Sequence, residues 1–217
     1  MKRNPGRPLG LPLAREGVPF VLGGLLPGVL MLPVLPSLGG LFVAFGLFAA
    51  FFFRDFERNV PDGAKLIVSP ADGTVIGIDE VHEPTFLGGP ATRVSIFMSV
   101  FNVHVNRAPV TGRVCYKYYS PGEFHVAFVD KASELNEQLS MGLEFGGQRC
   151  LVRQIAGWVA RRIVCRAEVG DELACGERFG LIRFGSRVDL FLPRETAVTV
   201  VVGDKVRAGE TVLGEAA

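Results

Sequence analysis

The chain has little net charge and few cysteines, and each shortage excludes a class of function. Its 23 Lys and Arg residues are balanced by 22 Asp and Glu residues, so the formal net charge is +1 at pH 7 and nucleic acid is not an expected partner. Its four cysteines form no C-x-x-C pair and stand among apolar neighbours. They are therefore expected to be small buried hydrophobes in a reducing compartment, and neither a metal site nor a disulfide is predicted.

Charge is missing altogether from 36 consecutive residues, 18–53. One helix crosses a hydrocarbon core about 30 Å thick with roughly 20 apolar residues, so this stretch is long for one span and short for two. Four prolines and the pair Gly39-Gly40 interrupt it. The pattern predicts two short helices, 20–34 and 38–53, that form a membrane hairpin or re-entrant pair. The alternative, a buried hairpin in a soluble fold, is disfavoured by the length of the uncharged stretch.

Basic residues flank the uncharged stretch on both sides. They are Lys2, Arg3, Arg7 and Arg15 before it and Arg54 and Arg58 after it. The positive-inside tendency places both flanks in the cytoplasm, which predicts that the protein lies at the cytoplasmic face of the cell membrane. A secretory signal is the competing interpretation, but the apolar run is too long and no small-residue cleavage site follows it. We expect a basic N-terminus over 1–17, a membrane hairpin over 18–53 and a catalytic domain over 54–217.

The remainder of the chain has the pattern of a mainly β (α+β) domain with one core. Short runs rich in β-branched and aromatic residues are punctuated by glycines and predict strands. The clearest runs are 65–68, 74–78, 93–97, 112–118 and 195–202. One short polar stretch, 131–139, has helical periodicity.

Two segments repeat each other at an offset of 33 residues. Residues 169–177 and 202–210 both follow the pattern V-G-D-x-φ-x-x-G-E, where φ is apolar. The pattern recurs in biotinyl and lipoyl carriers and in related barrel-sandwich folds, where turns of this kind connect short strands. Carriers also present a lysine at a hairpin tip, in a motif such as M-K-M, and this chain has none. The repeat therefore predicts a barrel-sandwich-like β domain rather than a carrier function.

Three motifs carry the chemistry. They are S-P-A-D-G-T-V at 69–75, F-N-V-H-V-N-R-A-P-V-T-G at 101–112, and F-G-S-R at 184–187. In this order and at these distances the chain resembles the phosphatidylserine decarboxylases of the short prokaryotic kind, over nearly its whole length. Further agreement comes from 53–55, 130–134 with 136–137, and 154–157 with 160–162. No single motif is specific, whereas the three together are.

The resemblance implies a self-processing enzyme with a pyruvoyl cofactor. In such families a serine attacks the preceding glycine carbonyl, an ester forms, and β-elimination splits the chain. Here that cleavage falls between Gly185 and Ser186, giving a large chain 1–185 and a small chain 186–217 that associate as a heterodimer. Ser186 becomes the pyruvoyl group, which forms a Schiff base with phosphatidylserine in the membrane and yields phosphatidylethanolamine. Two alternatives stay open: an archaetidylserine-type lipid decarboxylase, and a membrane-tethered barrel-sandwich adaptor without chemistry.

The residue types suit this chemistry. Gly185 leaves its carbonyl open to attack, because it has no Cβ. A serine hydroxyl is a poor nucleophile at neutral pH, so Ser186 needs a base. His104 is the candidate base, because imidazole changes charge near neutrality. Asp72 is the candidate acid that orients and stabilises the imidazole, as in Ser-His-Asp arrangements whose chain order varies.

Other readings of these residues remain. A Gly-Ser pair is usually a turn, and Asp-Gly is a common hairpin turn. Members of the family often carry two histidines around the second motif, whereas this chain has only His104 there. Whether His104 serves both self-cleavage and decarboxylation is therefore open, and His125 is the second candidate. His82 is expected at the surface. The cations Arg161, Arg162 and Lys117 are either phosphate contacts or interfacial anchors.

Overall fold

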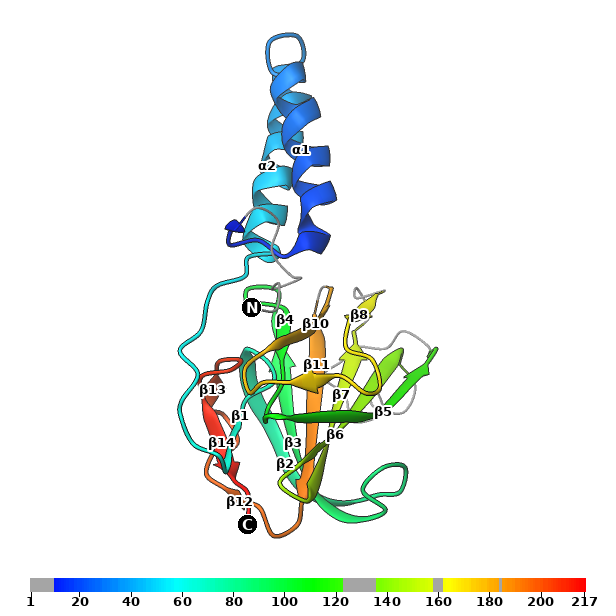
Figure 1. Ribbon diagram of the computed structural model, residues 1–217. Coiled ribbons are helices and arrows are strands. Elements are labelled where there is room, and N and C mark those ends of the chain that lie inside the picture. Colours follow the sequence, from blue (N-terminus) through cyan, green and yellow to red (C-terminus); the bar gives the residue numbers. More distant parts are fainter. Residues whose placement is uncertain (1–9, 123–135, 158–161, 184) are drawn as a thin grey trace. The chain divides into compact units, whose positions relative to one another are not determined.

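The computed structural model describes residues 10–122, 136–157, 162–183 and 185–217. It divides into two compact units, Met1–Glu57 and Arg58–Ala217. The first is helical and the second is built of β-strands (Figure 1). Each unit is described by itself.

The helical unit consists of two packed helices preceded by a short 3-10 helix. The 3-10 helix η2 covers Arg15–Gly17, α1 covers Val18–Met31 and α2 covers Pro36–Phe52. Both α-helices have proline in their first turn, where its missing N–H costs no hydrogen bond. The helices approach closely because glycines face each other: a Cβ on Gly24 would lie 2.5 Å from Cα of Gly46. Among the described residues, no helix combines the length and the hydropathy needed to cross a membrane.

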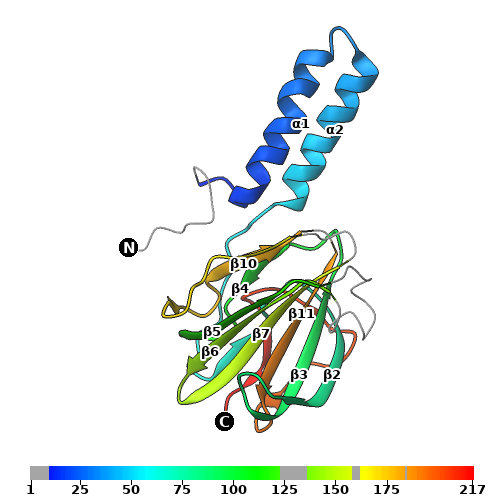
Figure 2. The same ribbon diagram turned by 90° about the vertical axis from the view of Figure 1, so that its right-hand side faces the viewer.

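The β unit is dominated by one antiparallel sheet in the order β13-β2-β3-β11-β7-β6-β5-β9. Figures 1 and 2 show this sheet curled into a half-barrel. In chain order its strands are β2 (Gly73–Glu83), β3 (Gly89–Met98), β5 (Gly112–Ser120), β6 (Gln138–Phe145), β7 (Gln148–Ala156), β9 (Glu172–Leu173), β11 (Ser186–Pro193) and β13 (Lys205–Val206). The mainly β prediction is confirmed.

Two smaller antiparallel sheets complete the unit, in the orders β1-β14-β12 and β4-β10-β8. Their strands are β1 (Leu66–Val68), β4 (Val105–Arg107), β8 (Ile163–Cys165), β10 (Arg178–Ile182), β12 (Ala197–Val198) and β14 (Val212–Glu215). The strand expected over 195–202 is therefore shorter than predicted. The helix expected over 131–139 is wrong at its end, since β6 begins at Gln138; residues 131–135 lie outside the described residues. Pairing of β6 with both β5 and β7 outweighs the weak helical propensity there.

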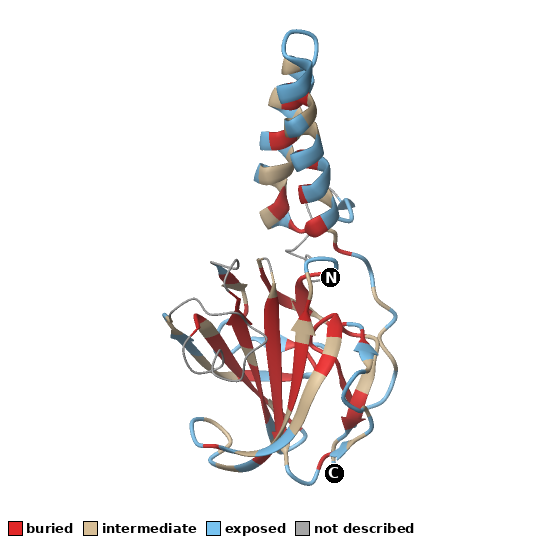
Figure 3. Ribbon diagram, turned by 180° about the vertical axis from the view of Figure 1, so that it is seen from behind, coloured by how far each residue is buried: buried red, intermediate tan, exposed pale blue. Residues whose placement is uncertain are grey.

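Strand β11 lies in the middle of the large sheet and is buried on both faces. Ser186 is fully buried, and Val188, Leu190 and Leu192 belong to the main hydrophobic core. The alternate residues point to the opposite face, where Phe191 packs with Ala91 and Leu151. Figure 3 shows the buried residues running along the middle strands of this sheet. Ser186 and Arg187 of the third motif are thus held in a central strand whose residues are buried from Ser186 to Leu192.

The repeat at 33 residues is visible in the backbone. Gly170 and Gly203 both have φ of +102°, and the next glycines, Gly176 and Gly209, have φ of +73° and +76°. Each copy supplies a short strand, β9 and β13, at opposite ends of the large sheet. The two copies therefore share the same backbone conformation at these glycines and occupy equivalent positions at the two edges of the large sheet.

A second repeat was missed in the sequence, and the structure makes it plain. Residues 69–75 (S-P-A-D-G-T-V) and 108–114 (A-P-V-T-G-R-V) lie next to each other. The N–H of Val68 donates to the Pro109 carbonyl at 2.9 Å, and the N–H of Arg107 donates to the Pro70 carbonyl at 2.9 Å. Each segment also holds one copy of the first repeat: Gly203 N–H donates to the Val75 carbonyl, and Gly170 N–H to the Val114 carbonyl. The unit is therefore internally two-fold.

Candidate active site

Ser186 is the first residue of β11 and is fully buried. The register places it between Met98, the last residue of β3, and Ala156, the last residue of β7. Its hydroxyl lies 3.5 Å from the sulfur of Met98. Thioether sulfur is a weak acceptor. The Ser186 hydroxyl is thus positioned by the sheet and held only weakly by its hydrogen-bond partner.

Gly185 precedes Ser186 in the left-handed region, with φ of +56°. A residue with a Cβ adopts this conformation only at a cost, whereas glycine adopts it freely. A Cβ built on Gly185 would meet no heavy atom within 4 Å. Glycine is therefore required here by the backbone conformation and not by crowding, and the Gly185–Ser186 peptide joins a left-handed turn to a buried strand.

His104 stands directly before β4 and is 2 % exposed. Its Nδ1 lies 3.0 Å from the carbonyl oxygen of Asn102. Because a carbonyl oxygen only accepts, Nδ1 carries the hydrogen, and Nε2 is the basic nitrogen of a neutral ring. The His104 carbonyl in turn accepts from the N–H of Ile182, the last residue of β10. The imidazole is therefore fixed in the tautomer that a general base at Nε2 requires.

One short connection joins the two candidate groups. Met98, which contacts the Ser186 hydroxyl, ends β3, and His104 follows six residues later. Between them, the side-chain oxygen of Asn102 accepts from the N–H of Ser99 at 2.8 Å and from its hydroxyl at 2.7 Å. Residues 98–104 are thereby locked as one turn. The structure thus links Ser186 and His104 through a rigid segment.

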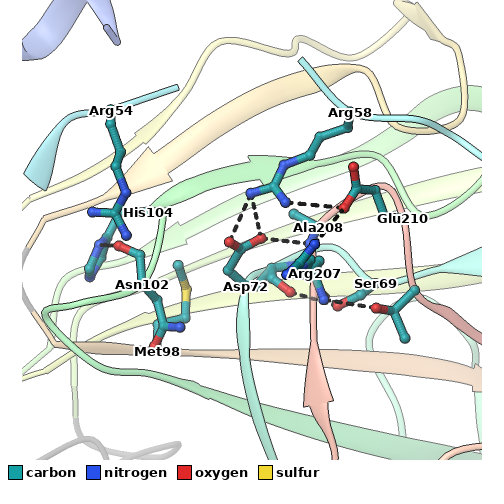
Figure 4. A network of polar contacts seen from close by, with 12 residues as sticks. Arg54, Arg58, Ser69, Asp72, Met98, Asn102, His104, Arg207, Ala208 and Glu210 are labelled. Carbon is teal, nitrogen blue, oxygen red and sulfur yellow. Dashed lines mark hydrogen bonds and ion pairs between the residues drawn. The ribbon is translucent and has the colours of Figure 1, made fainter. Parts of the chain in front are cut away.

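Asp72 directs its carboxylate to a different set of partners. Arg58 Nη2 donates to both of its oxygens, at 3.1 and 2.8 Å, and the N–H of Ala208 donates to Oδ1 at 2.7 Å. Arg58 also bonds Glu210 through Nη1 at 3.3 Å. Figure 4 shows the carboxylate turned toward Arg58 and Ala208. In the part of the chain that the structure describes, Asp72 makes no hydrogen bond to His104, so its role toward the imidazole stays a prediction.

The internal two-fold repeat separates two roles of Asp72. Its equivalent in the second half is Thr111, whose hydroxyl oxygen accepts from the N–H of Cys175 at 2.9 Å. Cys175 is the equivalent of Ala208 in the repeat of 33 residues. Accepting a hydrogen bond from this turn is therefore common to both halves. The negative charge and its contact with Arg58 belong to Asp72 alone.

Two buried polar residues that the sequence analysis did not single out complete the surroundings of Ser186. Asn106 Nδ2 lies 3.7 Å from the sulfur of Met98, and Gln154 Nε2 donates to Asn106 Oδ1 at 2.8 Å. Both side chains are fully buried. Asn106 belongs to the second motif and Gln154 to the 154–157 segment, and a position inside these matching segments is the signal that could have identified them. Asn106 lies next to the Met98 sulfur, which contacts the Ser186 hydroxyl, and Gln154 is hydrogen-bonded to Asn106. The two residues are therefore the buried polar groups on the far side of Met98 from Ser186.

Asn136, which lies just before β6, supports the same place. Its Nδ2 donates to the carbonyl of Ala156 at 2.7 Å, and Ala156 pairs with Ser186 across the sheet. The N–H of Ala156 donates to the carbonyl of Glu137 at 2.9 Å. The pair Asn136-Glu137 therefore fixes the strand end that faces Ser186.

The remaining candidates lie elsewhere or outside the described residues. His82 is exposed on β2, which confirms the surface prediction. Lys117 forms an ion pair with Glu168 at 2.7 Å, and Arg162 is exposed. His125 and Arg161 lie outside the described residues, as does Phe184.

The cysteines and acidic residues do not suggest a metal centre. All four cysteines, Cys115, Cys150, Cys165 and Cys175, are free, and burial raises the pKa of each thiol. A raised thiol pKa disfavours the thiolate that binds metals. Within the described ranges, no three His, Cys, Asp or Glu side chains form a group that could hold a metal ion.

Comparison with known proteins identifies relatives over almost the whole chain. The family model described as phosphatidylserine decarboxylase matches residues 45–214. The chain is 51% identical over 203 residues to a phosphatidylserine decarboxylase proenzyme of Symbiobacterium thermophilum, covering 93% of this chain and 94% of the relative. It is 48% identical over 207 residues to the proenzyme of that name from Desulfotalea psychrophila, covering 94% and 97%. The proenzyme of that name from Syntrophus aciditrophicus is 49% identical over 205 residues, covering 93% and 96%.

Proposed function

Because the chain belongs to the phosphatidylserine decarboxylase family, we infer that it decarboxylates phosphatidylserine to phosphatidylethanolamine. The observation that carries this conclusion is the match of the family model to 45–214, which includes all three motifs. About half of the aligned residues are identical in proenzymes of that name, over 94% to 97% of the length of each. An adaptor without chemistry would have no need of the buried serine, the left-handed glycine and the oriented histidine.

We propose that the chain cuts itself between Gly185 and Ser186. The Ser186 Oγ gives up its proton and attacks the Gly185 carbonyl carbon; the C–N bond breaks, the nitrogen takes a proton, and an ester forms. Loss of the Ser186 Cα proton then expels the Gly185 carboxylate by β-elimination. Water hydrolyses the resulting imine, so that the nitrogen leaves as ammonia and residue 186 becomes a pyruvoyl group. The left-handed φ of Gly185 and the weak hydrogen bond of the Ser186 hydroxyl support this step. The name proenzyme, printed for the relatives, agrees with a processed precursor.

His104 is the proposed base for Ser186. Its Nδ1–H donates to the Asn102 carbonyl, so Nε2 is the nitrogen that can accept the serine proton. The rigid segment 98–104 carries both His104 and the Met98 contact of Ser186. After processing, the same Nε2 is the candidate donor for the proton that the substrate α-carbon needs once carbon dioxide has left.

For Asp72 we propose the supporting role that the resemblance implies, a negative charge that stabilises the imidazolium after proton transfer. The contacts of Asp72 give it a second role in holding the turn at Ala208 and the side chain of Arg58. Substitution by asparagine separates these roles, because an amide oxygen still accepts from Ala208 N–H while the charge is lost.

The cofactor is generated from Ser186, and the residues around it fit this group. A pyruvoyl group supplies a ketone that condenses with the substrate amine and accepts the electrons released with carbon dioxide. Ser186 is fully buried, so water is excluded from its hydroxyl. Met98 and Ala156 hold the strand end on both sides. The strand end that carries Ser186 is therefore buried and held on both sides before cleavage.

We propose that the large and small chains stay together as a heterodimer after cleavage. The small chain, 186–217, contains β11, β12, β13 and β14. In the large sheet, β11 pairs with β3 and β7 on either side and β13 pairs with β2, while β14 pairs with β1 in a smaller sheet. Cutting the peptide before β11 breaks none of these ladders.

We propose that the helical unit holds the enzyme at the cytoplasmic face of the cell membrane. Its two helices carry no charged residue, and exposed leucines, valines and phenylalanines cover much of their surface. Since each helix is short, the pair enters the lipid as a hairpin or re-entrant segment rather than as two full spans. Holding the enzyme at the lipid surface raises the local concentration of its substrate.

Intact mass spectrometry of purified protein tests the mechanism. Active protein should contain a large chain ending at Gly185 and a small chain beginning with a blocked, pyruvoyl-modified residue 186. A single intact species of 23.4 kDa in active protein would contradict self-cleavage. Ser186→Ala is the control that must stay uncut. Release of carbon dioxide from phosphatidylserine, set against an ether-linked lipid with the same headgroup, distinguishes the main substrate from the archaetidylserine type.

A further inference from the structure

The turn between β3 and β4 carries two apolar side chains at its tip. The N–H of Asn102 donates to the Ser99 carbonyl at 3.0 Å, which closes a four-residue turn. Its two central residues are Val100, 37 % exposed, and Phe101, 70 % exposed. Central turn positions are dominated by Gly, Pro, Asn, Asp and Ser, because these residues suit the backbone and water. Turn geometry therefore gives no reason for valine and phenylalanine here.

The same turn is rigid and adjoins the candidate active site. The Asn102 side chain binds the backbone and hydroxyl of Ser99, so the exposed pair stands on a fixed base. On one side of the turn Met98 contacts Ser186, and on the other the Asn102 carbonyl accepts from His104. Whatever the tip contacts is therefore kept at a set distance from Ser186.

Cationic residues occupy the neighbouring segments. The N–H of Ile182 donates to the His104 carbonyl at 3.3 Å, and the next N–H, of Arg183, donates to the Arg162 carbonyl at 3.3 Å. The segments that hold His104, Ile182 and Arg162 thus lie side by side, and Figures 1 and 2 draw the ends of β4, β8 and β10 at one end of the β unit. Arg162 is exposed. An exposed apolar tip beside an exposed cation is the combination that favours the surface of an anionic bilayer.

We propose that residues 99–102 form a membrane-docking turn that inserts Val100 and Phe101 into the lipid surface, with Arg162 facing the anionic headgroups. The partner is a lipid surface and not a protein, because the tip is only two residues wide and its neighbours carry the charge opposite to that of the substrate lipid. Docking at this turn sets the Ser186 site at headgroup depth. The inference rests on the proposed function, since it assigns the surface that presents phosphatidylserine to that site.

Interfacial kinetics of the full-length processed enzyme test the proposal. The variant Val100→Ser/Phe101→Ser is compared with wild type by the ratio of its kcat/KM on vesicles containing phosphatidylserine to its kcat/KM on monomeric short-chain phosphatidylserine, so that an effect of the turn on the chemistry itself cancels. This ratio should fall by about tenfold, because the apolar area that enters the lipid is lost. The matched control is Val201→Ser/Val202→Ser, an equally apolar pair that is 62 % and 60 % exposed in another turn. The control should match wild type on both substrates.

A direct measurement of how deeply position 101 enters the lipid tests the proposal even where the helical unit supplies most of the membrane binding. Tryptophan replaces Phe101 in a Trp158→Phe background, so that position 101 carries the chain's one indole. On vesicles its emission should shift to the blue and be quenched by lipids brominated in the acyl chain, whereas tryptophan at Val201 should show neither change. Equal vesicle activity of the serine variant and wild type, or an unquenched tryptophan at 101, would overturn the docking turn. Absence of decarboxylation on both monomeric and vesicle substrate would instead overturn the proposed function.

Discussion

Arg187 and Asp189 form a buried ion pair on β11, directly after Ser186. Nε of Arg187 donates to Oδ1 of Asp189 at 2.6 Å, and Nη2 donates to the hydroxyl of Ser95 on β3 at 2.8 Å. The two side chains are 1 % and 0 % exposed. Residues two apart on a strand share a face, so the pair lies on the side of the sheet opposite to Ser186. The pair anchors the beginning of β11 to β3, and this anchor would matter most after the proposed cleavage, which would make residue 186 a chain end.

We expect Arg187→Met to destabilise the protein by about 3–5 kcal/mol, because Asp189 is left as a buried charge without its partner. Arg187→Met/Asp189→Leu should recover most of that loss, since both charges are gone. Urea unfolding in a Ser186→Ala background, which keeps one chain, measures both. If Arg187→Met unfolds at the same urea concentration as the Ser186→Ala parent, the pair has no anchoring role.

Gly185→Ala should slow self-cleavage. The left-handed conformation is about 1–2 kcal/mol less favourable for alanine than for glycine, so the substitution shifts the backbone away from φ of +56°. The time course of cleavage after synthesis in vitro, followed on a denaturing gel, measures the effect. The matched control is Gly146→Ala in the β6–β7 turn, where φ is +54° and the space is equally open. It should lose similar stability and still cleave at the normal rate.

His104→Ala and Asp72→Asn should both accumulate uncut precursor if, as we propose, His104 is the base for Ser186 and the Asp72 charge supports it. Members of such groups act as a unit, so the double variant should be little worse than His104→Ala. The fraction of uncut chain after a fixed time is the measurement. Thr111→Asn is the control for Asp72→Asn, since it places the same amide at the equivalent turn without removing a charge. Cleavage of His104→Ala at the normal rate would transfer the role of base to His125.

Glu83 gives the fold a pH dependence on the acid side. Burial opposes its charge, but hydrogen bonds from the Thr85 hydroxyl and the N–H groups of Leu87, Phe86 and Thr85 outweigh it, so its pKa lies below the ordinary 4.5. A lowered pKa contributes stability that is complete above the unfolded value and is lost as pH falls through the folded value.

Glu83→Gln should therefore be less stable than wild type near neutral pH, and the difference should shrink as pH falls below 4.5. Urea midpoints of both proteins at a series of pH values measure it. A constant difference across that range would show that the Glu83 charge does not contribute.

A chain beginning at Arg54 should still self-cleave and should decarboxylate phosphatidylserine dispersed in detergent micelles. It should lose most of its activity on vesicles and remain in the soluble fraction, because the role that we propose for the helical unit is placement at the membrane, and that unit contains no candidate catalytic residue. Western detection of the small chain and the two lipid assays measure this. A truncated chain that folds by circular dichroism but stays uncut would assign part of the processing core to the helical unit.

The sequence by itself determined the features that depend on neighbouring residues. The prolines and glycines of 18–53 placed two helices, since these residues act on their own turn of backbone. Runs of β-branched and aromatic residues placed part of β2 and β3 and most of β5, and the order of the three motifs led to the family. Gly185 was identified from the third motif, and its φ of +56° is a conformation that glycine adopts freely.

Only the tertiary structure decided which distant residues meet. It placed β6 over 138–139 where a helix was expected, because pairing with β5 and β7 outweighs local propensity. It brought Asn106 and Gln154 behind Ser186 through Met98, and it turned Asp72 toward Arg58. It also revealed that 69–75 lies next to 108–114. The similarity of these two segments is too weak to be recognised from the sequence alone. Contacts of this kind depend on how strands distant in the sequence pair and pack, and a pattern of neighbouring residues contains no information about that pairing.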